Sequence, residues 1–363
     1  MQNTAMSRWL APVMAFCLSF IIIVGLAPSL GLQIDRQIDF WLLWLGTMIF
    51  LALPTVFLEI ALAKRSKTSS LEALSKLTRD ADASQKWRIV GWLSAIFIPF
   101  LAGGVIYNIS QVTALNAQLN IDHTILFVAS AVIAFALSFV PRMILVILTA
   151  LGVIASFVLA NVMGTQDTVW QMTAIEFSEW GKATILALVA SGLGLGLYWQ
   201  TNVSTAQDTN TSDAASKLSL PIWIAQLIAV IAFGYFSVSA QLPAYTLLAT
   251  AIFAAAMLLQ LAKEQLQHRQ TAIFIQFPLL LVALLIWAVP NLAQILNPLL
   301  MLWGLVICLI YSIFVGWIMK ISHLRKAMNF SNEGFYNIWR IAVRIVLPLA
   351  IVVAIISFVG QLI

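Results

Sequence analysis

Residues 181–201 read GKATILALVASGLGLGLYWQT, and this stretch decides what kind of fold the chain can adopt. It is long and apolar enough to cross a bilayer, because a spanning helix needs about 20 mainly apolar residues. Directly after Ser191, three glycines alternate at Gly192, Gly194 and Gly196. Alternating glycines weaken a helix and leave backbone groups free to bind a solute, so we predict a helix that is broken within the membrane. The alternative is that these glycines only let helices pack closely.

The composition of the whole chain is typical of a membrane protein. Of its 363 residues, 62% are hydrophobic and 9% are charged, which is too little charge to cover a soluble surface of this size. Apolar windows of about 20 residues, bounded by charges, prolines or polar clusters, predict eleven spanning helices. They run over 8–30, 38–62, 89–112, 123–140, 142–163, 181–201, 217–239, 244–262, 271–289, 293–320 and 337–360. We therefore expect an all-α integral membrane protein surrounded by the lipid bilayer.

The basic residues are sorted between the two sides that these helices define. With the N-terminus inside, seventeen of the 19 Lys and Arg residues fall in inner segments, and only Arg36 and Lys182 fall in outer ones. Because cytoplasmic loops are enriched in Lys and Arg, this sorting predicts an inside N-terminus and, with eleven helices, an outside C-terminus. The inner basic residues face anionic lipid, so the net charge of +5 does not indicate a nucleic acid partner.

Several kinds of chemistry lack the residues that they need. The chain has no glycine-rich loop ending in Gly-Lys-Ser/Thr, so we do not expect ATP-driven pumping. His123, His268 and His323 lie at helix ends or in loops, which leaves no candidates for a histidine metal or haem site in the membrane. Cys17 and Cys308 lie inside apolar helices, so neither a disulfide nor a thiolate metal site is expected. The sequence therefore predicts no enzyme, no catalytic residues and no metal centre.

One inner connection, 63–88, has the pattern of a short helix. Ser69 and Glu72 have the spacing of a capping box, and leucines follow at intervals of three residues. We predict a helix lying on the inner face of the membrane, with a solvated linker as the alternative. The outer connection 164–180 is long and acidic, and its two tryptophans are typical of membrane-interface anchors.

One ionisable residue, Glu59, lies clearly inside a predicted span. A carboxyl in hydrocarbon is costly unless it is paired or protonated, so its presence needs a reason. It can be a carboxyl for proton coupling or for a gate network, or a buried acid that is hydrogen-bonded to backbone near the inner interface. Helix two runs from outside to inside and ends near Leu62, which places Glu59 less than one turn from its inner end and favours the structural interpretation.

A second glycine cluster lies toward the outer end of the first predicted helix, at Gly25, Leu26, Ala27 and Pro28. Interrupted helices at corresponding positions of two five-helix halves indicate the binding site of a transporter. Close packing of small residues is again the alternative.

At these positions the chain resembles the neurotransmitter:sodium symporter family. The likeness rests on Ser7-Arg8 before helix one, on LPTVFLEIAL at 53–62, on Val90-Gly91-Trp92 and Ile98-Pro99 in helix three, and on Trp339-Arg340, Arg344 and Pro348 in the last helix. The count of eleven helices resembles bacterial members that lack the twelfth. The resemblance implies a location in a bacterial inner (cytoplasmic) membrane.

The resemblance also implies an architecture, the five-plus-five inverted-repeat transporter fold. Helices one and six would be discontinuous and would hold the substrate between them. The chain would then be a single membrane domain with repeat one over 8–163, repeat two over 181–320 and an extra helix over 337–360.

The chain departs from the family at the residues that bind sodium. Family members carry Gly-Asn-x-x-Arg-Phe-Pro in the break of helix one, whereas the nearest stretch here is GLAPS at 25–29. In helix eight the family has hydroxyl ligands, and TAIFAAA at 250–256 offers Thr250 alone. The family's tyrosine in helix three aligns with Ile106, one step from Tyr107. Because sodium needs several oxygen ligands, coupling to two sodium ions is not expected.

We therefore expect a secondary active transporter of amino acids or related small amphipathic solutes that works by alternating access. The expected substrate-binding residues are Gly25, Leu26, Ala27, Pro28, Tyr107, Ser191, Gly192, Gly194 and Gly196. The candidates for coupling or gating are Glu59, Ser19 and Thr250, and sodium is the one cofactor left open beside proton coupling and facilitated diffusion. The alternative function is that of a transport-inactive relative acting as a regulatory or assembly subunit.

Overall fold

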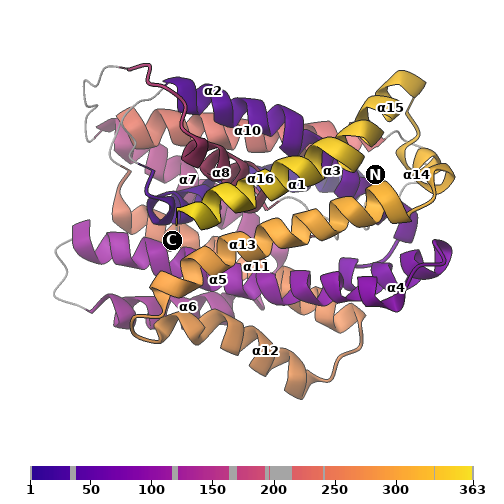
Figure 1. Ribbon diagram of the computed structural model, residues 1–363. Coiled ribbons are helices and arrows are strands. Elements are labelled where there is room, and N and C mark those ends of the chain that lie inside the picture. The colour runs from indigo at the N-terminus through magenta and orange to yellow at the C-terminus, as the bar shows by residue number, and fades with distance from the viewer. Residues whose placement is uncertain are drawn as a thin grey trace.

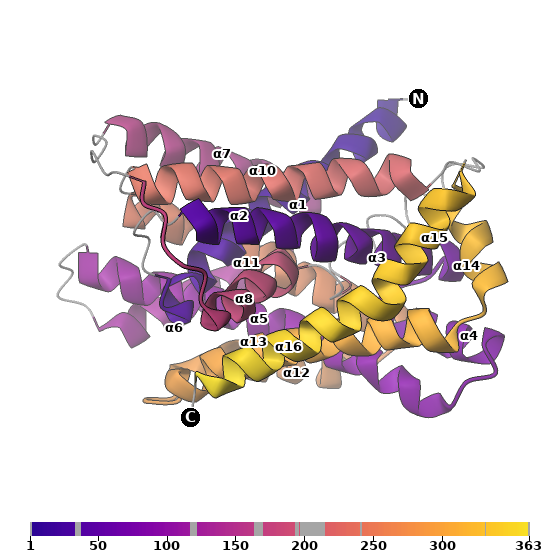
Figure 2. The same ribbon diagram turned by 45° about the horizontal axis from the view of Figure 1, so that its top comes forward.

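The computed structural model describes residues 2–32, 38–116, 122–162, 170–192, 196, 215–239, 242–330 and 332–361. Side chains are described in all of these except 2–8, 236–239 and 321–323. The regular structure of the described part is helical, and its long helices lie side by side in one bundle (Figure 1). The two termini lie at opposite ends of the bundle (Figures 1 and 2), as expected for an odd number of crossings.

Within the described residues, eight segments are long and apolar enough to cross a membrane, judged by length and composition. They are α1 (Gln2–Leu26), α2–η2–α3 (Ile38–Thr47, Met48–Ala52, Leu53–Ser66), η3–α5 (Gln85–Arg88, Ile89–Asn116), α7 (Arg142–Val162), α10 (Ala215–Ser239), α11 (Ala244–His268), α13–η6 (Ala293–Ile313, Phe314–Ile318) and α15–η7–α16 (Glu333–Ile341, Ala342–Val346, Leu347–Gly360). Two shorter apolar helices lie where the sequence predicts two more spans, α6 (His123–Leu137) and α12 (Ile273–Leu285), which η5 (Ile286–Ala288) continues. Helix six begins as α8 (Phe177–Ile185) and η4 (Leu186–Ala190).

Helix α5 lies at the centre of the bundle and packs through two glycines. In the span that contains α5, 78% of the hydrophobic window is buried, against 33% in α7, which lies at the outside of the bundle. Trp287 of η5 is fully buried and donates its Nε1–H to the Phe100 carbonyl of α5 at 3.0 Å. A Cβ on Gly103 would lie 2.6 Å from the Leu284 carbonyl oxygen, and one on Gly104 would lie 2.7 Å from the Trp287 ring. These glycines let α12 and η5 approach α5 closely.

The inner connection forms the short helix that the sequence predicts, α4 (Ser70–Asp80). Its leucines Leu71, Leu74 and Leu77 are buried. Ser69 is the N-cap, but its side chain makes no capping hydrogen bond, so the predicted capping box is wrong. The buried leucines fix the helix instead. Helices α4, α14 (Ile321–Met328) and α15 gather at the end of the bundle that holds the N-terminus (Figure 1).

Helix one is unbroken through the membrane. α1 runs to Leu26, and Pro28 then opens a single 3-10 turn, η1 (Pro28–Leu30), that ends at Gly31 with φ of 59°. The predicted cluster therefore produces a discontinuity at the end of the helix and not in its middle. The physical reason is that a proline at 28 has no N–H to continue the helical ladder, whereas the apolar residues before Gly25 keep it intact.

Helix six is broken where the sequence predicts. The π-helical η4 stops at Ser191, and Gly192 and Gly196 have φ values of +71° and +77°, which side chains on L-residues rarely allow. Of the three alternating glycines, Gly194 lies outside the described residues.

Four segments of the bundle contain a π-helical turn, and these turns are neighbours. η2 lies against η4 and η7, and η6 lies against η7. A π turn disturbs the regular ladder of backbone hydrogen bonds, and two carbonyls at these turns also accept a hydrogen bond from a tryptophan indole. Met48 accepts from Trp223 at 2.9 Å, and Arg344 accepts from Trp317 at 3.0 Å. The π turn of helix two therefore lies directly beside the π turn that ends at the helix-six break.

Candidate solute site at the helix-six break

The end of η4 presents one buried backbone carbonyl to side chains from two other helices. The Ser191 carbonyl oxygen accepts hydrogen bonds from Ser19 Oγ of α1 at 3.3 Å and from Gln226 Nε2 of α10 at 3.2 Å. All three residues are fully buried. Two side chains from different helices thus donate to one carbonyl at the end of a helix. The break thus joins helices one, six and seven at one point.

A second polar bond lies on the same face of α10, one turn before Gln226. Trp223 Nε1 donates to the Met48 carbonyl in η2 at 2.9 Å. Residues three apart are neighbours on a helix surface, so α10 supports the π turn of helix two and the break of helix six together. Gln226 is not predicted from the sequence, because an amide in an apolar helix carries no charge. Its signal is a polar side chain in the middle of a predicted span.

Ser19 lies at the break, but the other proposed hydroxyl ligand, Thr250, does not. Thr250 Oγ1 donates to the Thr246 carbonyl at 2.5 Å, and it would lie 2.3 Å from a Cβ built on Gly152 of α7. Thr250 therefore packs into the contact between α11 and α7. The structure does not bring Ser19 and Thr250 together in one ligand set.

The outer end of α1 packs against α5. A Cβ on Gly25 would lie 3.2 Å from Val105 Cα, so this glycine serves close packing between the two helices. Leu26 and Ala27 are buried, whereas Pro28 is exposed. Among the predicted residues of helix one, none of this cluster meets the Ser191 carbonyl, which Ser19 contacts from about two turns earlier in α1.

Tyr107 lies in an aromatic group of its own. Its ring is 5.9 Å from the ring of His123, 5.6 Å from Phe127 and 5.8 Å from Trp287, measured between centroids. These partners belong to α6 and η5. The structure therefore places Tyr107 between α5, α6 and η5, and brings it into contact with none of the residues at the Ser191 carbonyl.

The buried carboxyl Glu59 belongs to a polar group on the other side of the break. It is 2% exposed and acts electrostatically on Cys308 and Tyr311 of α13. The Tyr311 side chain in turn interacts with Ser94 of α5. A Cβ on Gly196 would lie 3.5 Å from Ser94 Oγ, so this polar group extends from helix two to the residue that follows the helix-six break.

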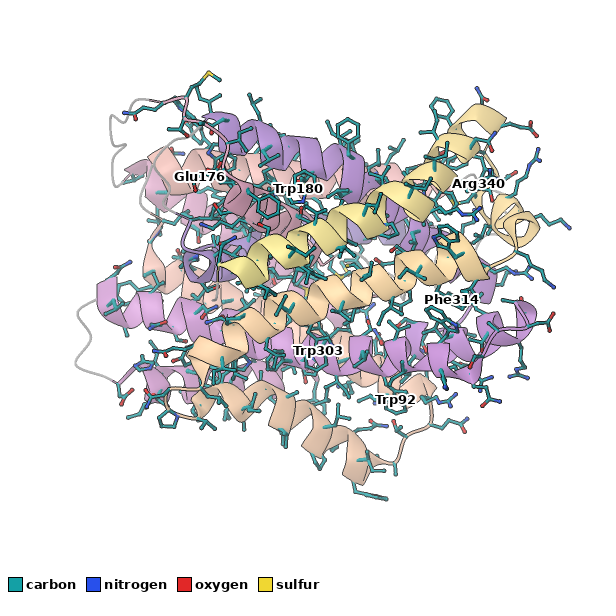
Figure 3. The ribbon with its side chains drawn as sticks, viewed as in Figure 1. Trp92, Glu176, Trp180, Trp303, Phe314 and Arg340 are labelled. Carbon is teal, nitrogen blue, oxygen red and sulfur yellow. The ribbon has the colours of Figure 1, made fainter. Side chains whose placement is uncertain are left out.

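The outer half of helix six is held by the last helix. Glu176 and Glu179 form a capping box that opens α8. Trp180 Nε1 then donates to the Ala350 carbonyl of α16 at 3.4 Å, and Ser357 Oγ donates to the Phe177 carbonyl at 2.7 Å. Figure 3 shows Glu176 and Trp180 at this end of α8, beside α16.

Two further polar pairs link helices at opposite ends of the bundle. Asn108 of α5 and Asn297 of α13 exchange amide hydrogen bonds at 2.9 and 3.3 Å. At the other end, Arg142 opens α7 and pairs with Glu264 of α11. Lys263 adds a hydrogen bond to the Ser138 carbonyl at 3.1 Å. Helices are therefore linked by neutral side-chain amides at one end of the bundle and by an ion pair at the other end.

The residues at the break offer neutral oxygens as possible ligands for a cation. They are the Ser191 carbonyl, Ser19 Oγ and Gln226 Oε1. This set fits a monovalent ion in type, because divalent ions favour carboxylates. Within the described residues, no group of three or more His, Cys, Asp or Glu could hold a metal ion.

Comparison with known proteins relates the chain to a solved transporter fold. No family model and no curated protein matches the sequence. Among solved structures, the chain is similar to the crystal structure of MhsT in complex with L-phenylalanine, with 13% identity and a TM-score of 0.59. The match covers 96% of this chain and 98% of that one. This likeness confirms the predicted all-α transporter fold, which the chain shares with MhsT. The predicted count of eleven spanning helices stays a prediction.

Proposed function

We propose that this chain is a secondary active transporter of amino acids or related small amphipathic solutes. The observation that carries the proposal is the helix-six break, where Ser19 and Gln226 from two other helices meet the Ser191 carbonyl. Irregular backbone is tolerated inside a membrane only where it is buried in protein or lines a cavity. Transporters of this kind bind their solute at such breaks, near the middle of the membrane. The shared fold with a protein solved in complex with L-phenylalanine supports the same solute class.

Alternating access requires contacts that open at one end while others hold at the opposite end. The Asn108–Asn297 pair and the Arg142–Glu264 pair are suited to this, because they join different helices at opposite ends of the bundle. In this proposal the repeats 8–163 and 181–320 move against each other, and the two pairs form and break in turn. The extra helix over 337–360 moves with the outer half of helix six, to which it is bonded through Trp180 and Ser357.

Two coupling routes are supported by different residues. A sodium ion would be held by the Ser191 carbonyl, Ser19 Oγ and Gln226 Oε1, and when bound it would add positive charge beside the solute. A proton would use Glu59, whose polar group reaches Gly196. Thr250 supports neither route, because it packs against Gly152.

The proposal is tested by uptake of a mixed panel of labelled amino acids into proteoliposomes that contain the purified full chain. Parallel reactions impose a sodium gradient, a pH gradient, both or neither, and protein-free liposomes are the control. We expect accumulation of at least one amino acid above its external concentration under one of the gradients. If no amino acid enters and none raises the melting temperature of the protein, the alternative of a regulatory or assembly subunit replaces the transporter.

A further inference from the structure

A tryptophan and an arginine on neighbouring helices form a fixed pair at the surface of the bundle. Trp317 of η6 donates its Nε1–H to the Arg344 carbonyl of η7 at 3.0 Å, and the Arg344 guanidinium lies over the Trp317 ring, 4.2 Å from its centroid. The two segments approach closely at Gly316, where a Cβ would lie 2.9 Å from Arg344 Cα. The backbone of η7 therefore fixes the exposed indole, and the indole in turn positions the guanidinium.

This pair lies where the last helix enters the apolar part of the membrane. A spanning helix needs about 20 mainly apolar residues, and counting this number back from Gly360 places the boundary near Ile341. The exposed residues around Arg344 are apolar, and they include Ile341, Ile345 and Leu349. Arg344 thus lies close to the level at which lipid phosphates give way to acyl chains.

The charge of Arg344 is not neutralised by a carboxylate within the described part of the chain. Two other basic residues at this end of the bundle are paired, since Lys320 lies 3.3 Å from Asp82 and Arg325 pairs with Glu333. Arginine stays charged in proteins, and a charge close to hydrocarbon is costly unless it finds a partner. The described carboxylates leave this position open to an anion from outside the protein.

A second arginine extends the positive charge along the same helix. Arg340 lies four residues before Arg344, so the two side chains are neighbours on the helix surface. Arg340 also lacks an ion pair among the described residues, and like charges at this spacing repel each other. Figure 3 shows Arg340 at the end of the bundle where α14 and α15 lie. A bound anion would offset the repulsion between the two arginines.

A phosphodiester is the anion that this surface fits. A guanidinium presents parallel N–H donors that match two oxygens of a phosphate, and such charge-assisted bonds are stronger than neutral ones. Basic residues beside a spanning helix attract anionic lipid, and exposed tryptophan is typical of the membrane interface. Ile345 and Leu349 continue the exposed surface with the apolar contact that acyl chains need. A lipid of zero net charge carries its own cation beside the phosphate, so a lipid of net negative charge is favoured.

We propose that Arg340, Arg344 and Trp317 bind the headgroup of an anionic phospholipid of the surrounding bilayer. The phosphate accepts hydrogen bonds from the guanidinium groups, and the acyl chains lie along Ile345 and Leu349. The bound lipid links η6 at the end of α13 to the last helix. This site goes beyond the transporter function and does not depend on it, because the partner is a component of the membrane and not the solute.

The proposal is tested by the thermal stability of the purified full chain in detergent micelles that contain phosphatidylcholine, which is replaced stepwise by phosphatidylglycerol. We expect the melting temperature of the wild type to rise and then to saturate. In Arg344→Gln the phosphatidylglycerol fraction at half-saturation should increase about ten-fold, because charge-assisted hydrogen bonds are lost. Lys320→Gln is the matched control, since it removes one positive charge from the same end of the bundle and should respond as the wild type does.

Three results would overturn the proposal. A wild-type melting temperature that does not change with phosphatidylglycerol means that the site does not exist. Equal losses in Arg344→Gln and Lys320→Gln mean that the lipid is attracted only by the overall charge of this end. If glycerol phosphate in solution stabilises the protein in place of phosphatidylglycerol, the arginines bind a soluble anion and not a lipid.

A second variant, Arg340→Gln, covers the case in which Arg344→Gln does not fold. Arg340 is partly exposed, and it makes no ion pair with a described residue that its loss could break. Its removal should raise the half-saturating fraction of phosphatidylglycerol about three-fold or more relative to Lys320→Gln. The same fraction in both variants contradicts the proposal.

Discussion

Helix one and helix six both carry a glycine cluster, and the two clusters fold differently. Gly25 lies in the last turns of an unbroken α1, where it lets the helix approach Val105. Gly192 and Gly196 follow the end of η4 and take positive φ. The comparison shows that a glycine marks a helix break where its backbone adopts a positive φ. A glycine that keeps helical backbone angles instead allows a neighbouring helix to pack closely.

The unbroken helix one also explains why the resemblance to the neurotransmitter:sodium symporters fails there. The family's break carries an asparagine and an arginine that this chain lacks, and a continuous α1 has no unwound backbone to position them. Helix one contributes to the site through one side chain, Ser19, while helix six contributes backbone. The site is therefore asymmetric between the two halves of the chain.

The most severe change should be one that prevents the break in helix six. Gly192→Val places a β-branched residue at φ of +71°, a conformation that costs about 1–3 kcal/mol. We expect a lower melting temperature and a loss of solute affinity of about ten-fold or more. Ligand-dependent melting of the variant checks this, with Gly46→Val in helix two as the control, because a Cβ there meets no atom within 4 Å. Wild-type affinity in a stable Gly192→Val protein would show that the break does not form the site.

A moderate effect is expected where helix one contributes its side chain. Ser19→Ala removes one buried hydrogen bond to the Ser191 carbonyl, a change of about 0.5–1.5 kcal/mol, so solute affinity should fall by roughly two- to ten-fold. Titration calorimetry measures it. Ser29→Ala is the matched control, because it removes a 2.8 Å bond to the Leu26 carbonyl at the far end of the same segment. Equal losses in both variants would mean that α1 acts only through its stability.

Glu59 of helix two belongs to the polar group that reaches Gly196 beyond the helix-six break. We expect its carboxyl to matter more for the stability of the protein than for proton coupling. Glu59 lies among Cys308, Tyr311 and Ser94, and we expect Glu59→Gln to lower the stability of the protein by about 1 kcal/mol while the pH dependence of uptake stays unchanged. Uptake at a series of external pH values measures the second part. A flat pH profile in the variant, against a sloping one in the wild type, would assign proton coupling to Glu59.

The smallest effect is expected at the glycine of helix one. In Gly25→Ala the added Cβ lies 3.2 Å from Val105, and this crowding opposes the gain in helix propensity of up to about 1 kcal/mol. The melting temperature and the solute affinity should both stay close to those of the wild type. If Gly25→Ala lost as much solute affinity as Gly192→Val, the Gly25–Pro28 cluster would be part of the binding site.

Much of the fold follows from hydropathy and local chemistry alone. The helix positions, the short helix α4 and the break at Ser191 could be predicted, because apolar length, leucine spacing and alternating glycines act within a few residues. The site depended on contacts that no local pattern encodes. Gln226 lies 35 residues beyond Ser191 in the chain, so no local pattern relates the two. Tyr107 and Thr250 contact helices other than those of the break, and these contacts are set by the packing of the whole bundle.

The central claim is that the solute lies at the helix-six break and not at the helix-one cluster. The most direct measurement is an experimental density map of the full chain with a bound amino acid, chosen as the one that raises its melting temperature most. We predict density for the solute within hydrogen-bonding distance of the Ser191 carbonyl and Gln226 Oε1. Density beside Gly25–Pro28 or Tyr107, with the Ser191 carbonyl still accepting from Ser19 and Gln226, would contradict the claim.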